Sequence, residues 1–131
     1  MKVLVSGGAG FIASNVNAEA IKRGHHVVAF DNLWRSDVSA NVKYFQEKYP
    51  ESYTFHWGDV RNPEDLELIP PVDAIIHFAE NPGAITSVYH PVYDFRSNAM
   101  GTFNVLEFAR KRNLPVIYAS TTKTMSDIVN T

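Results

Sequence analysis

The opening segment, residues 1–31, constrains the fold of this chain most strongly. A short valine-rich run, residues 3–5, is followed by glycines at positions 7, 8 and 10 and by a helix-compatible segment over residues 11–23. A second apolar run, residues 26–30, then ends on Asp31. Strand, glycine turn, helix, strand and acid in this order are the signature of a dinucleotide-binding βαβ unit.

Each part of this signature has a physical reason. Gly7 allows a sharp turn off the first strand, and Gly10 lets the backbone approach a pyrophosphate because it carries no side chain. The N-terminus of the following helix directs unpaired N–H groups and a partial positive charge at the phosphates. Asp31 follows the glycines by about 20 residues, where a carboxylate accepts hydrogen bonds from the adenosine ribose. The alternative is a βα turn whose glycines serve packing alone.

The rest of the chain alternates strand and helix patterns. A short helix is expected to start at Pro63 with Asn62 as its N-cap. The other expected elements are strands at residues 53–57, 74–76 and 116–120 and helices at residues 38–48 and 92–112. This alternation predicts one Rossmann-like domain over residues 1–131, an α/β doubly wound parallel sheet of about five strands in the order 3-2-1-4-5.

Ligands bind such sheets at the carboxyl ends of the strands. The small and polar residues that end the strands are therefore expected to form one site. They are Gly7, Asp31, Asp59, the turn at residues 78–80, and the pair Ser120 and Thr121.

Composition excludes several other functions. A formal net charge of −2 without a basic cluster argues against nucleic acid or an anionic membrane as a partner. The chain has no cysteine, and its histidines lack metal-ligand spacing, so neither a disulfide nor a metal site is expected. No apolar run reaches the ~18 residues of a membrane span, and a cytoplasmic protein is expected. Trp34 and Trp57 are more typical of packing than of stacking on adenine.

Successive blocks of the sequence resemble those of the extended short-chain dehydrogenase/reductases, the NAD-dependent nucleotide-sugar epimerases and dehydratases. The resemblance runs from residue 1 to about residue 123. The blocks are Val3-Leu-Val-Ser-Gly-Gly-Ala-Gly-Phe-Ile-Ala, Phe30-Asp-Asn-Leu, Gly58-Asp-Val-Arg-Asn, Ile75-Ile-His-Phe-Ala, Asn98-Ala-Met-Gly-Thr and Ile117-Tyr-Ala-Ser-Thr.

The resemblance implies NAD as the cofactor and assigns roles to its neighbours. Backbone N–H groups of Phe11 and Ile12 would line the pyrophosphate, and Asp31 with Asn32 would hold the adenosine ribose. A 2′-phosphate would meet the Asp31 carboxylate, so NAD is expected over NADP. The other implied contacts are Asp59 and Val60 with adenine, Phe78, Ala79 and Glu80 along the central part of the cofactor, and Asn98 as a helix amide that ties neighbouring loops together.

The implied catalytic group is Thr121, which would hydrogen-bond the sugar hydroxyl being oxidised. In the family a Tyr-x-x-x-Lys pair further along the chain takes the hydroxyl proton, and no tyrosine follows Thr121 here. The one such pair, Tyr44 and Lys48, precedes Thr121 by more than 70 residues and suits a solvated helix. Glu80 also departs from the family, which commonly has a small residue there. The chain as given is therefore expected to lack the catalytic pair and the sugar-binding region.

Lys123 after Thr121-Thr122 resembles the epimerases, especially the CDP-tyvelose (CDP-paratose) 2-epimerases, more than the dehydratases. A nucleotide-diphosphate sugar is the substrate that this implies, and a homodimer through the 92–112 helix is expected. Three hypotheses remain open at this stage. The chain is the NAD-binding portion of a nucleotide-sugar epimerase or dehydratase, a non-catalytic NAD- or nucleotide-binding sensor module, or an interaction scaffold with an empty site.

Overall fold

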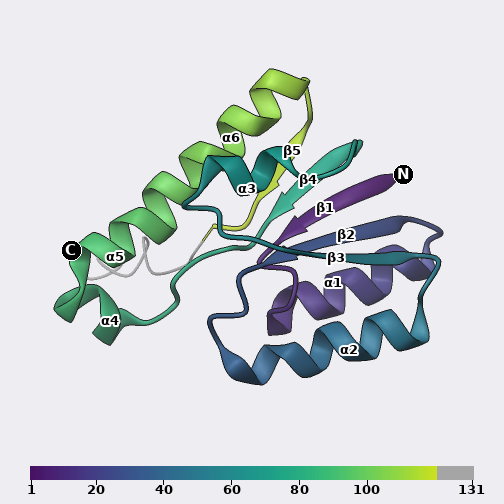
Figure 1. Cartoon of the computed structure of the whole chain (residues 1–131), viewed down its shortest axis with the longest axis horizontal. Coiled ribbons are helices and arrows are strands. Elements are labelled where there is room, and N and C mark those ends of the chain that lie inside the picture. The colour runs from purple at the N-terminus through teal and green to yellow at the C-terminus, as the bar shows by residue number, and fades with distance from the viewer. Residues whose placement is uncertain (121–131) are drawn as a thin grey trace, which may run out of the picture.

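A parallel sheet with helices on both faces forms the framework of the molecule (Figure 1). The computed structural model describes residues 1–120 of the chain. The strands are β1 (Lys2–Ser6), β2 (His26–Asp31), β3 (Tyr53–Trp57), β4 (Ala74–His77) and β5 (Val116–Tyr118), and their order across the sheet is β3-β2-β1-β4-β5. Every neighbouring pair is parallel. The predicted Rossmann-like sheet and its strand order are confirmed.

The helices lie in two layers. In Figure 1, α1 and α2 cover one face of the sheet, and α3 and α6 cover the other. Their bounds are α1 (Phe11–Lys22), α2 (Ser39–Lys48), α3 (Pro63–Glu67), α4 (Ala84–Tyr89), α5 (Pro91–Phe95) and α6 (Gly101–Arg112). A 3₁₀ turn, η1 (Ser36–Val38), precedes α2, and a π-helical turn, η2 (Arg96–Met100), joins α5 to α6.

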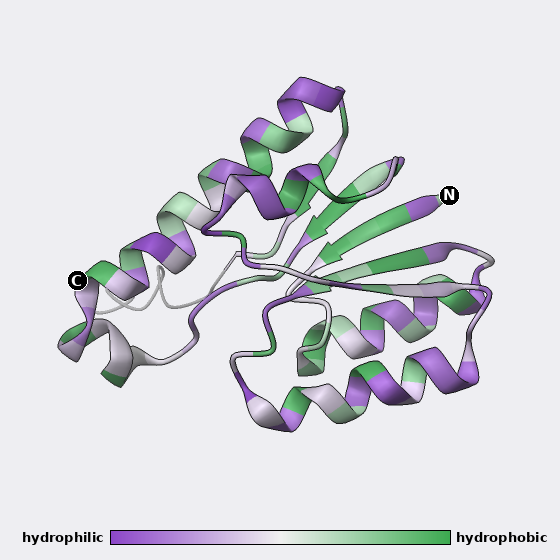
Figure 2. Cartoon of the chain, viewed as in Figure 1, coloured by the Kyte–Doolittle hydropathy of each residue, from purple (hydrophilic) through white to green (hydrophobic). Residues whose placement is uncertain are grey.

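Two apolar layers hold the sheet between the helices. Side chains alternate along a strand, so Leu4, Val28 and Ile75 share a cluster with residues of α3 and α6. Val5 and Ala29 belong to the second cluster, with residues of α1 and α2. Figure 2 shows the result, with hydrophobic colour along the strands and hydrophilic stripes on the helices. Because the core strands bury both faces, their near-continuous apolar runs are those of a parallel sheet.

The region between β4 and β5 differs from the prediction. The expected helix over residues 92–112 starts at Pro91 and contains the π-helical turn η2 instead of one regular helix. Helix α4 was not predicted, because a segment of six residues with three β-branched side chains has weak helical preference. The structure thus places an additional helical turn, α4, between β4 and α5.

Asn62 and Pro63 occupy the predicted N-cap and first positions of α3, although no side-chain hydrogen bond caps this helix. One smaller expectation is corrected. Strand β5 ends at Tyr118, so Ser120 follows the strand and does not belong to it.

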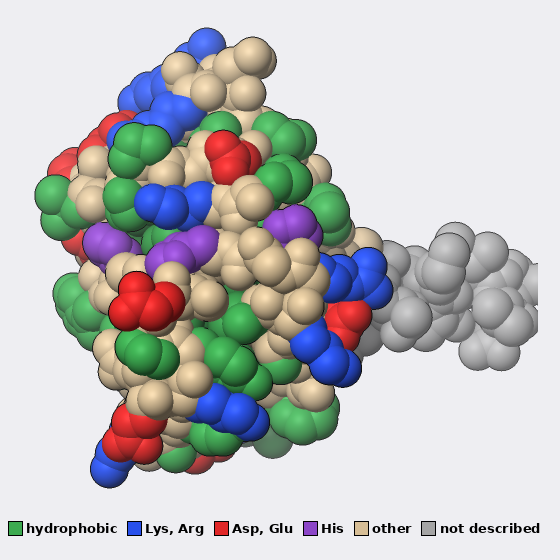
Figure 3. All heavy atoms as spheres, turned by 90° about the vertical axis from the view of Figure 1, so that its right-hand side faces the viewer, with side chains coloured by type: hydrophobic (Ala, Val, Ile, Leu, Met, Phe, Trp, Pro, Cys, Tyr) green, Lys and Arg blue, Asp and Glu red, His purple; other side chains and the backbone are tan. Residues whose placement is uncertain are grey.

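The surface at the N-terminal ends of the strands carries mixed charges. Figure 3 shows basic, acidic and histidine side chains interspersed with hydrophobic ones on this face. The basic residues at the end of α6 are paired, Arg110 with Glu107 and both Lys111 and Arg112 with Glu67. Within residues 1–120, no helix is long and apolar enough to cross a membrane.

Candidate functional site

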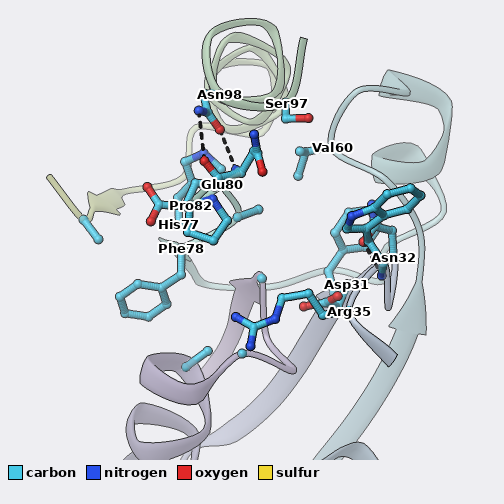
Figure 4. Close-up of a pocket in the computed structure, with 18 of the residues that line it drawn as sticks. Asp31, Asn32, Arg35, Val60, His77, Phe78, Glu80, Pro82, Ser97 and Asn98 are labelled. Atoms are coloured by element: carbon cyan, nitrogen blue, oxygen red, sulfur yellow. Dashed lines mark hydrogen bonds between the residues drawn. The ribbon is translucent and has the colours of Figure 1, made fainter. Parts of the chain in front are cut away.

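A cavity of about 1050 Å³ opens at the carboxyl ends of the strands (Figure 4). Every residue that the sequence assigned to the cofactor lines it: Gly7, Gly10, Phe11, Ile12, Asp31, Asn32, Asp59, Val60, Phe78, Ala79, Glu80 and Asn98. Ser120 also lines the cavity, whereas Thr121 lies outside the described residues. The volume lies just above the range of ordinary ligand pockets, roughly 300–1,000 Å³. The expected gathering of strand ends is therefore present.

The glycine turn forms the floor of this cavity. Gly7 has a φ of +68°, and a side chain there would come within 2.8 Å of the backbone nitrogen of Ala79. This close approach brings the β1–α1 turn against the segment after β4. The turn is held from below by the buried Asn17, whose amide nitrogen donates to the carbonyl of Gly8 at 2.9 Å.

The start of α1 is open to the cavity. Gly10 is its N-cap residue, and no side chain accepts a hydrogen bond from the first N–H groups. The side chains of Phe11 and Ile12 are 83% and 63% exposed. An uncapped helix start leaves backbone donors and a partial positive charge for an anion.

Gly10 tests whether a pyrophosphate fits here. Its φ is an ordinary −67°. A Cβ at this position would meet one atom within 4 Å, the carbonyl oxygen of Gly7 at 3.2 Å. A side chain at position 10 would require the Gly7 carbonyl to shift by a few tenths of an ångström, and it would stand at the edge of the cavity that Gly10 lines. The residues present fit a phosphate-bearing ligand.

Asp31 ends β2 with its carboxylate fixed by the backbone. One oxygen accepts from the N–H of Ala9 at 3.1 Å, and the other accepts from the N–H of Leu33 at 2.8 Å. Each carboxylate oxygen has two lone pairs, so both can accept one further bond from a ligand hydroxyl. Asp31 is thus oriented without being saturated.

Asp59, in contrast, has a carboxylate that is fully hydrogen-bonded within the protein. The Arg61 guanidinium donates to both carboxylate oxygens of Asp59, at 2.9 and 2.6 Å, and the backbone N–H of Arg61 donates a third bond. The side-chain amide of Asn32 donates a fourth, at 2.8 Å. Burial raises the pKa of this carboxyl, but the hydrogen bonds from Arg61 and Asn32 outweigh burial and leave the pKa below its ordinary value. All four lone pairs are used. An adenine amine would therefore have to displace a protein donor, a restriction that the sequence did not indicate.

Asn98 lies on the π-helical turn η2 and faces the segment after β4 (Figure 4). Its side-chain oxygen accepts from the backbone N–H of Asn81 at 2.6 Å, and its amide nitrogen donates to the Asn81 carbonyl at 3.4 Å. The helix amide therefore holds the segment beside Glu80, as expected from the sequence. π-helical turns often occur at functional sites because the extra residue redirects side chains.

Three polar side chains beside the cavity form a hydrogen-bonded series from β1 through β4 to α6. His77 is 1% exposed, and its ring nitrogens contact the hydroxyls of Ser6 at 2.5 Å and Thr102 at 3.0 Å. Burial lowers the pKa of His77 to about 4, so the ring is neutral near pH 7. No group of three metal-ligating residues is found within residues 1–120.

Other sequence candidates lie away from the cavity or at its edge. Tyr44 and Lys48 are hydrogen-bonded at 2.6 Å on the exposed side of α2, outside the cavity lining. Trp57 donates to the carbonyl of Asn32 and does not line the cavity, whereas Trp34 does, and its side chain is 73% exposed.

Residues that sequence reasoning missed are Asn81, Arg35 and Tyr93, which all line the cavity. The available signals were weak. Asn81 precedes a proline in a loop, Arg35 lies in a polar loop, and Tyr93 lies in a segment expected to pack as a regular helix.

Residues 3–128 match the model of the NAD dependent epimerase/dehydratase family. The chain belongs to the NAD-dependent epimerase/dehydratase family. The resemblance stated from the sequence blocks is confirmed.

Curated members of the epimerase/dehydratase family include similar sequences. The CDP-paratose 2-epimerase of Salmonella typhi is 35% identical over 98% of this chain and 39% of its own length. A UDP-glucose 4-epimerase of Cyamopsis tetragonoloba is 34% identical over 94% of this chain and 36% of its own length. The chain thus spans less than two-fifths of the length of these relatives.

Solved epimerase structures share the fold. The UDP-glucose 4-epimerase of Stenotrophomonas maltophila, with bound NAD and formylated UDP-arabinopyranose, has a TM-score of 0.84 and 28% identity over 94% of this chain and 38% of that one. The UDP-glucose 4-epimerase of Thermus thermophilus, in complex with NAD, has a TM-score of 0.75 and 33% identity over 92% of this chain and 38% of that one.

Proposed function

We propose that this chain is the NAD-binding portion of a nucleotide-sugar epimerase. The observation that carries the proposal is the cavity at the carboxyl ends of the strands. It combines an uncapped helix start, a glycine whose missing side chain leaves room for a phosphate, and an oriented carboxylate at the end of β2. These are the groups that a dinucleotide requires.

Different residues of the chain would bind different parts of the cofactor. The backbone of Gly10, Phe11 and Ile12 would bind the pyrophosphate, and Asp31 with Asn32 would orient the adenosine ribose. Val60 would flank the adenine beside Asp59. The segment of residues 78–80, held by Asn98, would line the central part.

Bound NAD would supply the hydride acceptor for transient oxidation of a sugar hydroxyl. Thr121 is proposed to hydrogen-bond that hydroxyl on a nucleotide-diphosphate sugar. The relatives named above act on or bind CDP- and UDP-linked compounds, which supports this substrate class. A Tyr-x-x-x-Lys pair after Thr121 is absent from this sequence. We therefore expect cofactor binding without turnover from these 131 residues.

NAD is expected to bind more tightly than NADP, because a 2′-phosphate would face the Asp31 carboxylate. Arg35 is the basic side chain that lines the cavity among the described residues, and it is paired with Asp37 at 3.0 Å. Asp31→Ala should weaken NAD binding by about 1.5–3 kcal/mol, the range for a hydrogen bond to a charged group. It should also reduce the ratio of NAD affinity to NADP affinity. Titration calorimetry with both dinucleotides measures this.

Glu51→Ala is the matched control, because Glu51 is an exposed acid just before β3, away from the cavity lining. It should bind NAD like the unaltered chain. Equal affinity for NAD and NADP in the unaltered chain would contradict the assignment of Asp31 to the ribose and would point to Arg35 as a phosphate ligand.

We also propose that the chain self-associates through the helical segment of residues 92–112. Phe95, Met100, Phe103 and Leu106 are 40–58% exposed along it, and such an apolar surface is typical of an interaction site. Sedimentation velocity should show a concentration-dependent dimer, and Phe103→Glu should shift it to monomer. A monomer at every concentration would exclude this interface.

A further inference from the structure

The short helix α5 touches both halves of the cavity through two adjacent residues. Tyr93 and Asp94 occupy its middle, and both are half-buried. Tyr93 contacts side chains from the loops after β2 and β3, and Asp94 contacts the segment that follows β4. The two walls of the cavity, on either side of the point where the strand order reverses, are thus fastened to one helix.

Asp94 holds the wall formed by the segment after β4. A single carboxylate oxygen accepts from the side-chain amides of Asn81 at 2.9 Å and Asn98 at 3.1 Å. Asn98 in turn accepts the backbone N–H of Asn81. Bonds to an ionised acceptor are roughly twice as strong as neutral ones. Removal of Asp94 would leave the amides of Asn81 and Asn98 without their common acceptor.

Tyr93 holds the opposite wall. The guanidinium of Arg61 lies 4.9 Å from the centre of the Tyr93 ring, and the Trp34 ring lies 5.8 Å from it. Arg61 is the residue that saturates Asp59. A cation over an aromatic face is attracted to it, more strongly when partly desolvated. The Tyr93 ring therefore limits where Arg61, and with it the Asp59 end of the cavity, can move.

We propose that Tyr93 and Asp94 are positioning residues for the ligand cavity, Tyr93 for the wall at the adenine end and Asp94 for the wall of residues 78–83. The proposal rests on the proposed function in so far as the ligand is NAD. Its physical basis is preorganisation: loops that are already fixed cost no ordering entropy when the ligand binds. Neither residue needs to touch the ligand to have this effect.

The test compares NAD with AMP, a fragment that carries the adenine, its ribose and one phosphate but lacks the part of NAD that would lie along residues 78–83. Asp94→Ala should lower the affinity for NAD about ten-fold, the cost of ordering one or two side chains, and leave AMP binding unchanged. Tyr93→Ala should lower the affinity for AMP and NAD by the same factor. Asp94→Asn keeps an acceptor oxygen and Tyr93→Phe keeps the ring, so each should restore most of the binding. Glu47→Ala, at an exposed position of α2 outside the cavity lining, is the control.

Amide hydrogen exchange supplies a readout without any ligand. The N–H of Asn81, bonded to Asn98, should exchange faster in Asp94→Ala and at the unaltered rate in Tyr93→Ala. Equal losses of AMP and NAD affinity in both alanine variants, or unchanged Asn81 exchange in Asp94→Ala, would overturn the positioning roles. An unaltered chain that binds no NAD but shows the expected exchange pattern would refute the proposed cofactor alone.

Discussion

Gly10→Val is expected to lower the affinity for NAD by at least about a thousand-fold, equivalent to ~4 kcal/mol. The reason is steric, because the valine side chain would occupy the space that we assign to the pyrophosphate. The fold should accommodate the change through a shift of a few tenths of an ångström at the Gly7 carbonyl. The φ of Gly10 is −67°, and a Cβ would meet the carbonyl oxygen of Gly7 alone, at 3.2 Å. Loss of the N-cap glycine should cost about 1 kcal/mol.

Titration calorimetry measures the affinity, and urea unfolding checks the fold. Asn15→Ala is the matched control on the same helix, since the Asn15 amide donates to the carbonyl of Phe11 on an exposed side. It should bind NAD normally. If Gly10→Val bound NAD as tightly as the unaltered chain does, the phosphates could not lie at the start of α1.

Gly7→Ala is expected to lower the free energy of unfolding by at least about 4 kcal/mol, an exceptional value for a single methyl group. Two effects combine. A residue other than glycine at a φ of +68° costs about 1–2 kcal/mol of backbone strain, and the new Cβ would lie 2.8–2.9 Å from backbone atoms of residues 78 and 79. These backbone atoms cannot swing aside as the end of a flexible side chain can.

Gly24→Ala separates the two effects. Gly24 has a φ of +82°, and a Cβ there would meet nothing within 4 Å. This variant should therefore lose only the strain, about 1–2 kcal/mol. Urea unfolding of both variants measures the difference. Equal losses would mean that Gly7 does not approach the segment after β4 closely, and the width of the cavity would then need another explanation.

The sequence predicts the framework well because its signals are local. Gly7, Gly10 and Asp31 lie within one βαβ unit, and the turn and the anion-binding helix start depend on neighbours in the chain. Asn98 was placed from the resemblance, and its bond to Asn81 is present. For Gly7, Gly10 and Asp31, spacing along the chain was sufficient to predict position, whereas Asn98 required the family resemblance.

The sequence does not predict how the cavity walls are fixed. Asp59 looks like a free carboxylate in the sequence, yet its lone pairs are all taken, by Arg61 two residues away and by Asn32 in another loop. Tyr93 meets Arg61 and Trp34 only after the sheet has brought their loops together. Such contacts depend on side-chain directions, and most of them on long sequence separations, which no periodicity encodes.

We expect NAD to bind in the cavity at the carboxyl ends of the strands. The most direct test is a titration of the isotope-labelled chain with NAD, followed by amide chemical shifts in NMR spectra. The largest shifts are expected at the N–H groups of residues 10–13, with further shifts at Asp31 and at residues 78–81, all in the cavity lining. Shifts confined to the N-terminal ends of the strands, or no shifts at all, would contradict it.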